Sequence, residues 1–385
     1  MIKCLETKMS SAILYVEFMQ NRLQNEHKEA IADLVNAPIT PQASFSRSGE
    51  FMLLLERAGN PTIEELAQPE LRIAGIRINP ATNGPSRGGS VENVKLKNTR
   101  SGMEQDIKGL PTSPRLGNFS LSKDEKFVAM THTSNTGISL WVVDLSNLEA
   151  KKLTNEIVNG VYGNGITWTP DNKILLKAVN PSRGNMPKAP LAPAGPIVQE
   201  TSGNAAPSRT YQDLLSNSYD EALFAYFMDS QLMLVDLSGN KQAVGPSGLI
   251  SSIDLSPDGN YIMVDLIKKP FSYLVPWSSF AEKTVVCDKT GKLVQEIDNR
   301  PASDNLPKGF MSTHKYKRSI SWRDDKPATL IYVLALDGGD PENKVDYRDE
   351  VFSMEAPFKA GTEKSLLKTQ QRFSGFEWGK EDLAI

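Results

Sequence analysis

One short stretch of this sequence has the spacing of a catalytic serine motif. Gly84-Pro85-Ser86-Arg87-Gly88-Gly89 fits the pattern G-x-S-x-G, in which a serine at the apex of a sharp turn attacks a carbonyl carbon. Such a turn needs a strand leading straight into it and a helix leaving it. Here Asn79-Pro80 separates the preceding predicted strand from the turn, and residues 90–97 alternate as a strand. We therefore attribute the match to chance or to a structural role, and we do not expect Ser86 to be a nucleophile.

A serine nucleophile also needs a general base, and the histidines suggest none. His132 ends a predicted strand and His314 lies in the polar loop HKYKR, so neither has a context that favours a base oriented by a carboxylate. A zinc site needs about four Cys, His or carboxylate ligands at short spacings. His27, Cys4 and Cys287 are too scattered to complete one, and we expect no disulfide between the cysteines. The sequence therefore predicts no catalytic, metal-binding or cofactor-binding residue.

The acidic segment ALDGGDPENKVDYRDEV, residues 335–351, invites a calcium interpretation. It lacks the D-x-[DN]-x-[DN]-G spacing and the terminal Glu of a calcium-binding loop. Asp337-Gly338-Gly339-Asp340-Pro341 is better explained as a turn between two strands. Paired carboxylates could also indicate a glycosidase, but the sequence places no pair at the required separation.

Composition and charge disfavour several classes of protein. The 385 residues are 39% hydrophobic and 23% charged, as in ordinary globular proteins. The formal net charge is −3 and no basic tract carries interleaved aromatic residues, so we expect no nucleic acid and no anionic membrane as a partner. No run approaches the roughly 20 apolar residues of a membrane span. We expect no export signal in the chain, and the sequence leaves its cellular location open.

An internal repeat accounts for most of the chain. Six segments share one form, which is an apolar strand, a polar turn and a second strand rich in Val, Ile, Leu and Met. They are SFSRSGEFMLLLE from Ser44, FSLSKDEKFVAMT from Phe119, ITWTPDNKILLKA from Ile166, IDLSPDGNYIMVD from Ile253, ISWRDDKPATLIYVLA from Ile320 and FEWGKEDLAI from Phe376. The equivalent turn positions are Ser46, Ser122, Thr169, Ser256, Arg323 and Gly379.

A second hairpin follows most of these turns. Alternating strands that end at Asp144, Asp236 and Asp288 each lead through a polar turn into another strand, and weaker versions occupy residues 91–107 and 349–367. Two hairpins per repeat give four antiparallel strands, which form one blade of a β-propeller. We therefore predict an all-β fold, an incomplete β-propeller of about five four-stranded blades plus the start of a sixth, with a short N-terminal helix. The alternative, a β-sandwich or an irregular all-β domain, predicts no recurrence of one turn at one place.

Segments outside the repeat divide the chain further. Residues 1–37 form a predicted helical segment, because residues 10–35 carry apolar side chains at helical spacing. Residues 38–385 form the partial propeller, with insertions at 55–89 and 180–229. We expect both insertions at the ends of the propeller, because an insertion inside a blade would break its hydrogen-bond ladder.

The insertions contain their own predicted elements. The first has a short helix over 63–66 and an extended segment over 71–78. The second is rich in proline and then predicts a helix over 210–228, with Leu214, Leu215, Leu223, Phe224 and Phe227 facing inward.

Four long strings in these loops are more distinctive than the blades. They are IEELAQPELRIAGIRINPATNGPSR, RTYQDLLSNSYDEALF, KKPFSYLVPWSSF and LALDGGDPENKVDYRDEVF. With them, the chain from about Ala37 to Ile385 resembles the propeller of the glutamyl endopeptidase branch of the prolyl oligopeptidase family.

The resemblance implies a fold and an activity. Members of that branch are serine peptidases with an N-terminal β-propeller and a C-terminal α/β-hydrolase domain. The family cleaves peptides after glutamate with a Ser, an Asp and a His that all belong to the hydrolase domain, while the propeller screens the substrate. This sequence is expected to lack the hydrolase domain and the last blades, and residues 1–36 do not resemble the exported N-terminus of bacterial members. No catalytic residue carries over to it.

Two hypotheses of different classes follow. The chain is either the propeller part of a peptidase, inactive alone, or a free-standing propeller that binds a protein or peptide. The first is favoured, with a peptide substrate that is bound through the missing catalytic domain. Because the last blade is incomplete, the open blade edges also predict self-association.

Overall fold

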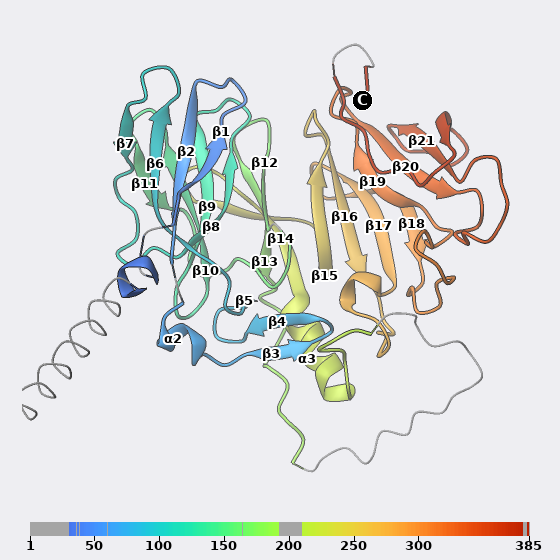
Figure 1. Ribbon diagram of the computed structural model, residues 1–385, viewed down its shortest axis with the longest axis horizontal. Coiled ribbons are helices and arrows are strands. Elements are labelled where there is room, and N and C mark those ends of the chain that lie inside the picture. Colours follow the sequence, from blue (N-terminus) through green and yellow to red (C-terminus); the bar gives the residue numbers. More distant parts are fainter. Residues whose placement is uncertain are drawn as a thin grey trace, which may run out of the picture.

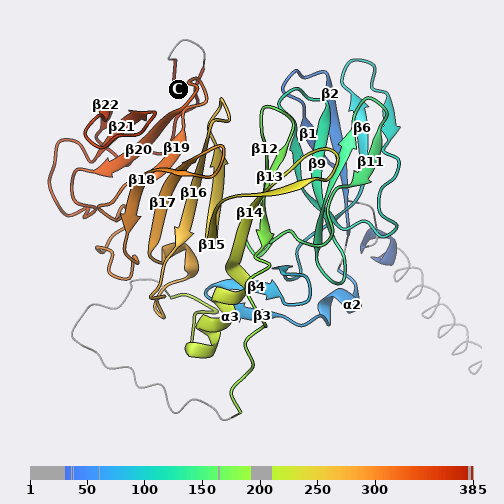
Figure 2. The ribbon, with the colours of Figure 1, turned by 180° about the vertical axis from the view of Figure 1, so that it is seen from behind.

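The computed structural model describes residues 31–35, 37, 39–59, 61–163, 165–191, 210–379 and 383–384. These residues form a mostly β structure with few helices. Apart from a three-stranded sheet in the first insertion, their strands fall into five consecutive four-stranded antiparallel units, which we call blades 1 to 5. Figures 1 and 2 show the blades side by side in an arc, with blades 1 and 2 at one end and blade 5 at the other.

The first two blades together contain eight strands. Blade 1 consists of β1 (Gln42–Phe45), β2 (Phe51–Arg57), β6 (Val91–Asn98) and β7 (Glu104–Asp106). Blade 2 consists of β8 (Leu116–Leu121), β9 (Phe127–Thr133), β10 (Ile138–Asp144) and β11 (Glu149–Lys152). The pairing of Val91 with Leu116 joins the two blades, and a parallel bridge links Lys108, which follows β7, to Glu149 in β11.

The next three blades follow the same order. Blade 3 consists of β12 (Ile166–Trp168), β13 (Ile174–Val179), β14 (Asp229–Val235) and the first part of the long strand β15 (Lys241–Leu255). Blade 4 takes the second part of β15 with β16 (Tyr261–Ile267), β17 (Glu282–Asp288) and β18 (Leu293–Arg300). Blade 5 consists of β19 (Arg318–Trp322), β20 (Thr329–Ala335), β21 (Asp349–Glu355) and β22 (Lys364–Thr369).

The turn between the first two strands of each blade explains the repeated residues. In blade 2 the Ser122 hydroxyl donates to Asp124 Oδ1 at 2.7 Å and accepts from the Phe127 N–H at 3.0 Å. The equivalent hydroxyls of blades 3 and 4 form the same pair of hydrogen bonds. In blade 5 Arg323 replaces the hydroxyl and pairs with Asp325 at 2.6 Å. The repeated residues are therefore those whose side-chain hydrogen bonds stabilise a tight turn. We call the end of the blades at which these turns lie the turn end.

Clusters of buried apolar side chains fill the four boundaries between consecutive blades. Strand β9 shows how the sequence achieves this. Val128 and Met130 pack toward blade 1, whereas Ala129 packs toward blade 3. A strand that is covered on both faces has to be apolar at nearly every covered position, as the run Phe-Val-Ala-Met at the start of β9 is. Each blade thus depends on its neighbours for burial.

The two insertions meet at the end opposite the turn end. The first contains α2 (Ile63–Leu66), β3 (Leu71–Ile73), β4 (Ile76–Asn79) and β5 (Gly84–Pro85), and the second contains α3 (Ser218–Met228). Strands β3 and β4 and helix α3 share one apolar cluster with residues 267–280, which include the 3-10 helix η1 (Trp277–Ser279). We call this assembly the cap; it lies below the blades in Figure 1, outside the blade sheets.

Three predicted elements differ from the structure. Only Ser218–Met228 of the expected helix over 210–228 is helical, because Asn217 Oδ1 accepts from the Asp220 N–H as an N-cap and the Asp213 carbonyl oxygen instead accepts from the Gly75 N–H. The extended segment over 71–78 is a hairpin that turns at Ala74 and Gly75, both with positive φ. After blade 5, the described residues show one isolated bridge, Trp378 to Ala384, and no further strand.

The predicted helix over 10–35 lies mostly outside the described residues. Residues 31–35 are helical. None of the helices in the described part of the chain is long and apolar enough to cross a membrane.

Candidate functional site

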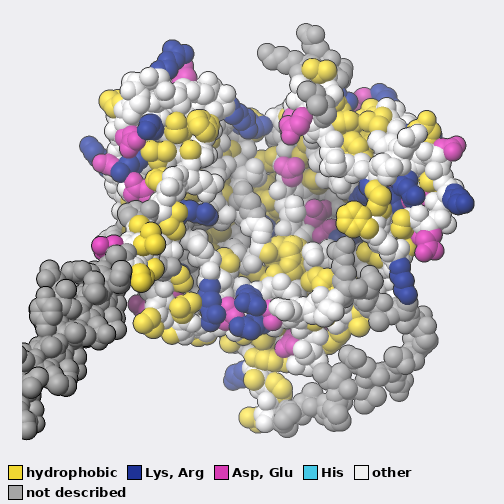
Figure 3. All heavy atoms as spheres, in the orientation of Figure 1, with side chains coloured by type: hydrophobic (Ala, Val, Ile, Leu, Met, Phe, Trp, Pro, Cys, Tyr) yellow, Lys and Arg dark blue, Asp and Glu magenta, His cyan; other side chains and the backbone are white. Residues whose placement is uncertain are grey.

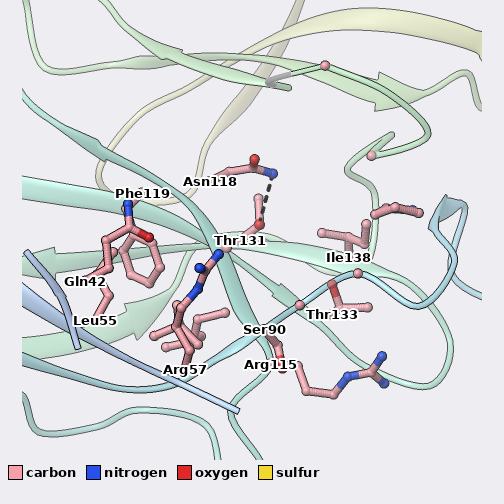
Figure 4. A pocket seen from close by; sticks show the side chains of 18 of the residues that line it. Gln42, Leu55, Arg57, Ser90, Arg115, Asn118, Phe119, Thr131, Thr133 and Ile138 are labelled. Atoms are coloured by element: carbon pink, nitrogen blue, oxygen red, sulfur yellow. Dashed lines mark hydrogen bonds between the residues drawn. The ribbon is translucent and has the colours of Figure 1, made fainter. Parts of the chain in front are cut away.

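A cavity of about 510 Å³ lies where blades 1 and 2 meet the cap. Its walls come from β1, the end of β2, β8 and β9, and residues 85, 88–90 and 160–163 close it on the cap side. Figure 3 shows the wider hollow between blades 1–2 and blades 4–5, and Figure 4 shows the cavity from close by. Its volume falls within the range of about 300–1,000 Å³ that ligand sites occupy.

Two arginines and no carboxylate line the cavity. Arg57 is the last residue of β2, and Arg115 directly precedes β8. Arg115 Nε lies 3.6 Å from Glu65 Oε1 in α2. Arg57 is exposed, and within the described part of the chain no ion pair or side-chain hydrogen bond engages it. The cavity therefore presents one guanidinium that has no anionic partner.

Neutral hydrogen-bonding groups lie beside Arg57. Asn118 Nδ2 donates to Thr131 Oγ1 at 3.3 Å, and Thr131 is buried. Because the hydroxyl oxygen accepts from the amide, its own proton remains available for a ligand. Figure 4 shows the Arg57 guanidinium pointing toward this pair, whereas Arg115 extends away from it. Together these three side chains offer a set of donors to an oxygen-rich ligand.

Two glycines let the cap approach blade 2 closely. A Cβ atom at Gly84 or at Gly160 would lie 2.6 Å from Ile138 Cδ1, a distance that real side chains do not reach. The Gly160 N–H donates to the Asn83 carbonyl oxygen at 3.1 Å. Gly84, the first glycine of the G-x-S-x-G match, therefore lies in close contact with the end of the Ile138 side chain, which would have to shift to make room for a larger residue.

A buried pair of asparagines joins both insertions behind this wall. Asn83 Nδ2 donates to Asn159 Oδ1 at 2.9 Å, and Asn159 Nδ2 donates to the Phe227 carbonyl oxygen in α3 at 2.9 Å. Arg183 donates to Asn83 Oδ1, and its guanidinium carbon lies 4.0 Å from the ring centroid of Tyr226. A satisfied buried network of this kind holds one geometry, so it fixes the cap relative to the cavity.

A buried lysine lies behind the cavity residue Tyr162. Lys177, on β13, is 2% exposed, and its Nζ donates to the carbonyl oxygens of Tyr162 at 2.9 Å and Ser251 at 3.4 Å. No carboxylate among the described residues pairs with it, and burial lowers the pKa of Lys177 to about 8. At neutral pH Lys177 is therefore mostly charged and places positive charge next to the cavity wall.

Carboxylates also lie near Tyr162 but do not line the cavity. Burial, followed by the negative charges of Glu282 and Asp265, raises the pKa of Tyr162. Glu282 accepts from Arg300 at 3.2 Å, and burial raises the pKa of Asp265 to about 6. The Tyr162 hydroxyl is buried and has no hydrogen-bond partner among the described residues.

Ser86 lies on the cap with a carboxylate as its partner. Its hydroxyl donates to Glu70 Oε2 at 2.8 Å, and Glu70 also accepts from Arg72 Nε at 2.7 Å. The hydrogen bond from Ser86, and then that from Arg72, lower the pKa of Glu70. The next element is strand β6 and not a helix. No hydroxyl in the described ranges is hydrogen-bonded to a histidine ring, so the structure brings no serine and base together.

The other residues singled out from the sequence lie apart from Ser86. His132 Nε2 is 3.2 Å from the Ser113 carbonyl oxygen, and its ring packs at an angle against Trp141. Burial lowers the pKa of His314, whose Nδ1 is buried without a partner among the described residues. Cys287 is a buried free thiol in β17, whereas His27 and Cys4 lie outside the described residues.

Asp337 in the acidic segment is held by arginines. Its Oδ2 accepts from Arg348 at 2.8 Å and from Arg372 at 2.7 Å, and its Oδ1 accepts from the Gly339 N–H at 2.9 Å. This is the turn that the sequence favoured over a calcium loop. Elsewhere too, the described residues contain no group of three or more His, Cys, Asp or Glu side chains that could hold a metal ion.

Sequence reasoning missed the cavity residues. Asn118 and Thr131 lie on the two paired strands of one predicted hairpin, β8 and β9, but Arg57 belongs to β2, and only the packing of blade 1 on blade 2 brings it beside them. The one available signal was Arg57 itself, a charged residue at the end of the apolar run LLLER. A charged residue is equally expected where any strand ends, so this signal does not indicate a binding site.

Comparisons with known proteins relate the chain to two plant proteins. It is 34% identical over 370 residues to a probable chloroplastic glutamyl endopeptidase of Oryza sativa subsp. japonica, which covers 92% of this chain and 39% of the rice protein. A protein of the same description from Arabidopsis thaliana is 33% identical over 370 residues, which covers 92% of this chain and 38% of that protein. The chain thus spans about two fifths of the length of these relatives. No protein-family model matches it.

Solved structures with a similar chain path include an acylaminoacyl peptidase of Pyrococcus horikoshii. Its alignment with this chain has a TM-score of 0.43 and 13% sequence identity. The alignment covers 90% of this chain and 42% of the acylaminoacyl peptidase chain. A putative TolB from Agrobacterium tumefaciens has a TM-score of 0.38 and 9% identity, over 86% of this chain and 81% of its own.

Proposed function

The chain is a homologue of glutamyl endopeptidases over 92% of its length, and on this basis we propose that it is the N-terminal propeller portion of a serine peptidase of the prolyl oligopeptidase family. In this proposal residues 1–37 are a helical N-terminal segment and residues 38–385 are most of a β-propeller. The five consecutive four-stranded blades, each packed only on its neighbours, support that division.

The proposed role of this portion is to screen peptide substrates. The activity of the whole protein is then peptide-bond hydrolysis, carried out by parts of the relatives' length that this chain does not span. A cavity beside the cap, with unpaired donors on its walls, is a suitable place for a peptide to bind before it reaches a catalytic centre.

The cap end is the proposed face for a catalytic domain. The connections that leave β2 and β13 form the cap at this end. They expose large apolar side chains there, with Ile63 86% and Leu66 45% exposed. Phe310, in the connection between blades 4 and 5, is 96% exposed.

The single observation that carries the proposal is the 34% identity over 370 residues, and activity assays test it. The chain alone should bind peptides that contain glutamate and should not hydrolyse them, because Ser86 is hydrogen-bonded to Glu70 and is joined to no histidine of the described residues. Mass spectrometry of the peptides after incubation measures this. Hydrolysis that follows the purified chain and disappears in Ser86→Ala would overturn the interpretation of Ser86.

A free-standing propeller that binds a protein or peptide is the second candidate. One observation favours it: the side chains that offer hydrogen-bond donors in the cavity, Arg57, Asn118 and Thr131, all belong to this chain. The DNA that follows the coding sequence distinguishes the candidates. A reading frame for an α/β-hydrolase domain supports the peptidase, whereas a stable, monodisperse chain of this length with no such frame supports the binding module.

A further inference from the structure

We infer that the cavity between blades 1 and 2 binds a carboxylate group of a peptide and that Arg57 determines this preference. The inference rests on the proposed function, because it assumes that the cavity receives a peptide. It adds a named specificity-determining residue and the chemical group that this residue recognises.

The charges around the cavity are the first support. Five other arginines lie nearby on the cap or at its edge. Four have a carboxylate within 4 Å, namely Arg72 and Arg87 with Glu70, Arg77 with Asp213, and Arg115 with Glu65, and the fifth, Arg183, is held by Asn83 and the Tyr226 ring. Arg57 has no such partner among the described residues, although it lines the same cavity as Arg115. A guanidinium without an anion at the wall of a concave site favours a ligand that supplies one.

The neighbouring donors match the shape of a carboxylate. Such a group has two oxygens and accepts up to four hydrogen bonds. The planar fork of Arg57 can donate two of them to the pair of oxygens. The Thr131 hydroxyl, which already accepts from Asn118 at 3.3 Å, is free to donate another. A neutral carboxamide in the same place would turn its NH₂ group toward the Arg57 guanidinium, which has no acceptor to offer it.

The electrostatic surroundings act in the same direction. None of the residues that line the cavity is Asp or Glu, so a bound anion meets no like charge on the walls. Lys177 Nζ contacts the backbone of the lining residue Tyr162 and has no carboxylate partner in the described ranges. The nearby Glu282 is neutralised by Arg300 at 3.2 Å. The charged groups at and behind the cavity wall therefore carry a net positive charge, which favours a bound anion.

Peptide binding measured by fluorescence anisotropy tests the inference with the full chain. Three short labelled peptides of one sequence are compared: a central Glu with an amidated C-terminus, a central Gln with an amidated C-terminus, and the Gln peptide with a free C-terminal carboxylate. The chain variants are Arg57→Gln, Arg57→Lys and, as a control, Arg100→Gln. Arg100 is exposed in the turn between β6 and β7, at the turn end of blade 1.

The unaltered chain should bind at least one carboxylate peptide about tenfold more tightly than the amidated Gln peptide, the size expected for a charge-assisted pair of hydrogen bonds. Arg57→Gln should abolish that difference, Arg57→Lys should retain part of it, and Arg100→Gln should leave it unchanged. The Glu peptide and the free C-terminus show which source of the carboxylate the cavity accepts. Circular dichroism confirms that each variant is folded.

Other outcomes separate the inference from the proposed function. Equal binding of all three peptides leaves the peptide-binding role standing and overturns the carboxylate preference. A Glu preference that survives in Arg57→Gln overturns the assignment to Arg57. Binding of none of the peptides contradicts the proposed peptide-binding role of the chain, and the inference falls with it.

Discussion

The indole N–H of Trp168 donates a hydrogen bond of 2.9 Å to the carbonyl oxygen of Ser120. Trp168 ends the first strand of blade 3, and Ser120 lies in the first strand of blade 2. This bond joins adjacent blades, where the other contacts are mostly apolar. Trp322 holds the equivalent place in blade 5, but its indole N–H is buried without a partner among the described residues.

This difference predicts unequal effects of one substitution at two places. Trp168→Phe removes a buried hydrogen bond and leaves the Ser120 carbonyl oxygen without that donor, whereas Trp322→Phe removes a polar group that has no partner. Both lose similar ring area. Trp168→Phe should therefore lower the free energy of unfolding by about 1 kcal/mol more than Trp322→Phe does. Urea denaturation followed by fluorescence measures both, and equal losses would show that the hydrogen bond contributes nothing.

Lys177 predicts a dependence of stability on pH. Burial lowers its pKa from 10.5 to about 8, so between these values the unfolded chain binds more protons than the folded chain. Stability should therefore rise with pH from about 8 upward, and below that pH the buried charge is unfavourable by about 3 kcal/mol. Lys177→Met should lack the rise and should be more stable than the unaltered chain at pH 7.

Denaturation between pH 7 and about 9.5 is the suitable measurement, because tyrosines titrate above that range. The substitution also removes the donor to the Tyr162 carbonyl oxygen, which costs about 1 kcal/mol and makes the net gain at pH 7 smaller than the full penalty. An equal rise with pH in Lys177→Met would show that another group is responsible.

Arg372 predicts a large loss of stability. Its guanidinium lies 2.7 Å from Asp337 and 2.9 Å from Asp349, and both aspartate side chains are fully buried. Arg372→Met should lower the free energy of unfolding by about 3–5 kcal/mol, because it leaves two buried carboxylates with fewer partners. Lys364→Met is the matched control. Its partner Glu355 and Lys364 itself are 64% and 67% exposed, so its loss should stay below about 1 kcal/mol in the same assay.

The outer face of blade 1 predicts self-association. Phe45 pairs with Met52 on the face that points away from blade 2, and it is 64% exposed. We expect the chain to associate at micromolar concentration in sedimentation velocity, and Phe45→Lys to weaken this association. Leu293→Lys is the control, because Leu293 is 60% exposed but lies in β18 of blade 4, which has a blade on each side. A compact monomer with a cooperative melt would contradict the prediction.

Much of the fold follows from short-range chemistry that the sequence displays. The turn of each blade is specified within about five residues, as in Ser122 with Asp124, so its recurrence could be recognised without any structure. The hairpins that turn after Asp144 and Asp288 could be recognised from the sequence in the same way. The sequence also indicated that Ser86 is not a nucleophile, because its flanking residues do not build the strand–turn–helix that a catalytic serine needs.

The cavity and its charges depended on the tertiary structure. Arg57 and Arg115 have the same chemistry in the sequence, and only the position of α2, which places Glu65 beside Arg115, leaves Arg57 without a partner among the described residues. Gly84 looked like part of a catalytic motif, whereas its close approach to Ile138 gives it a packing role. Contacts between residues so far apart in the chain depend on how the blades and the cap pack, and no local pattern of residues encodes that arrangement.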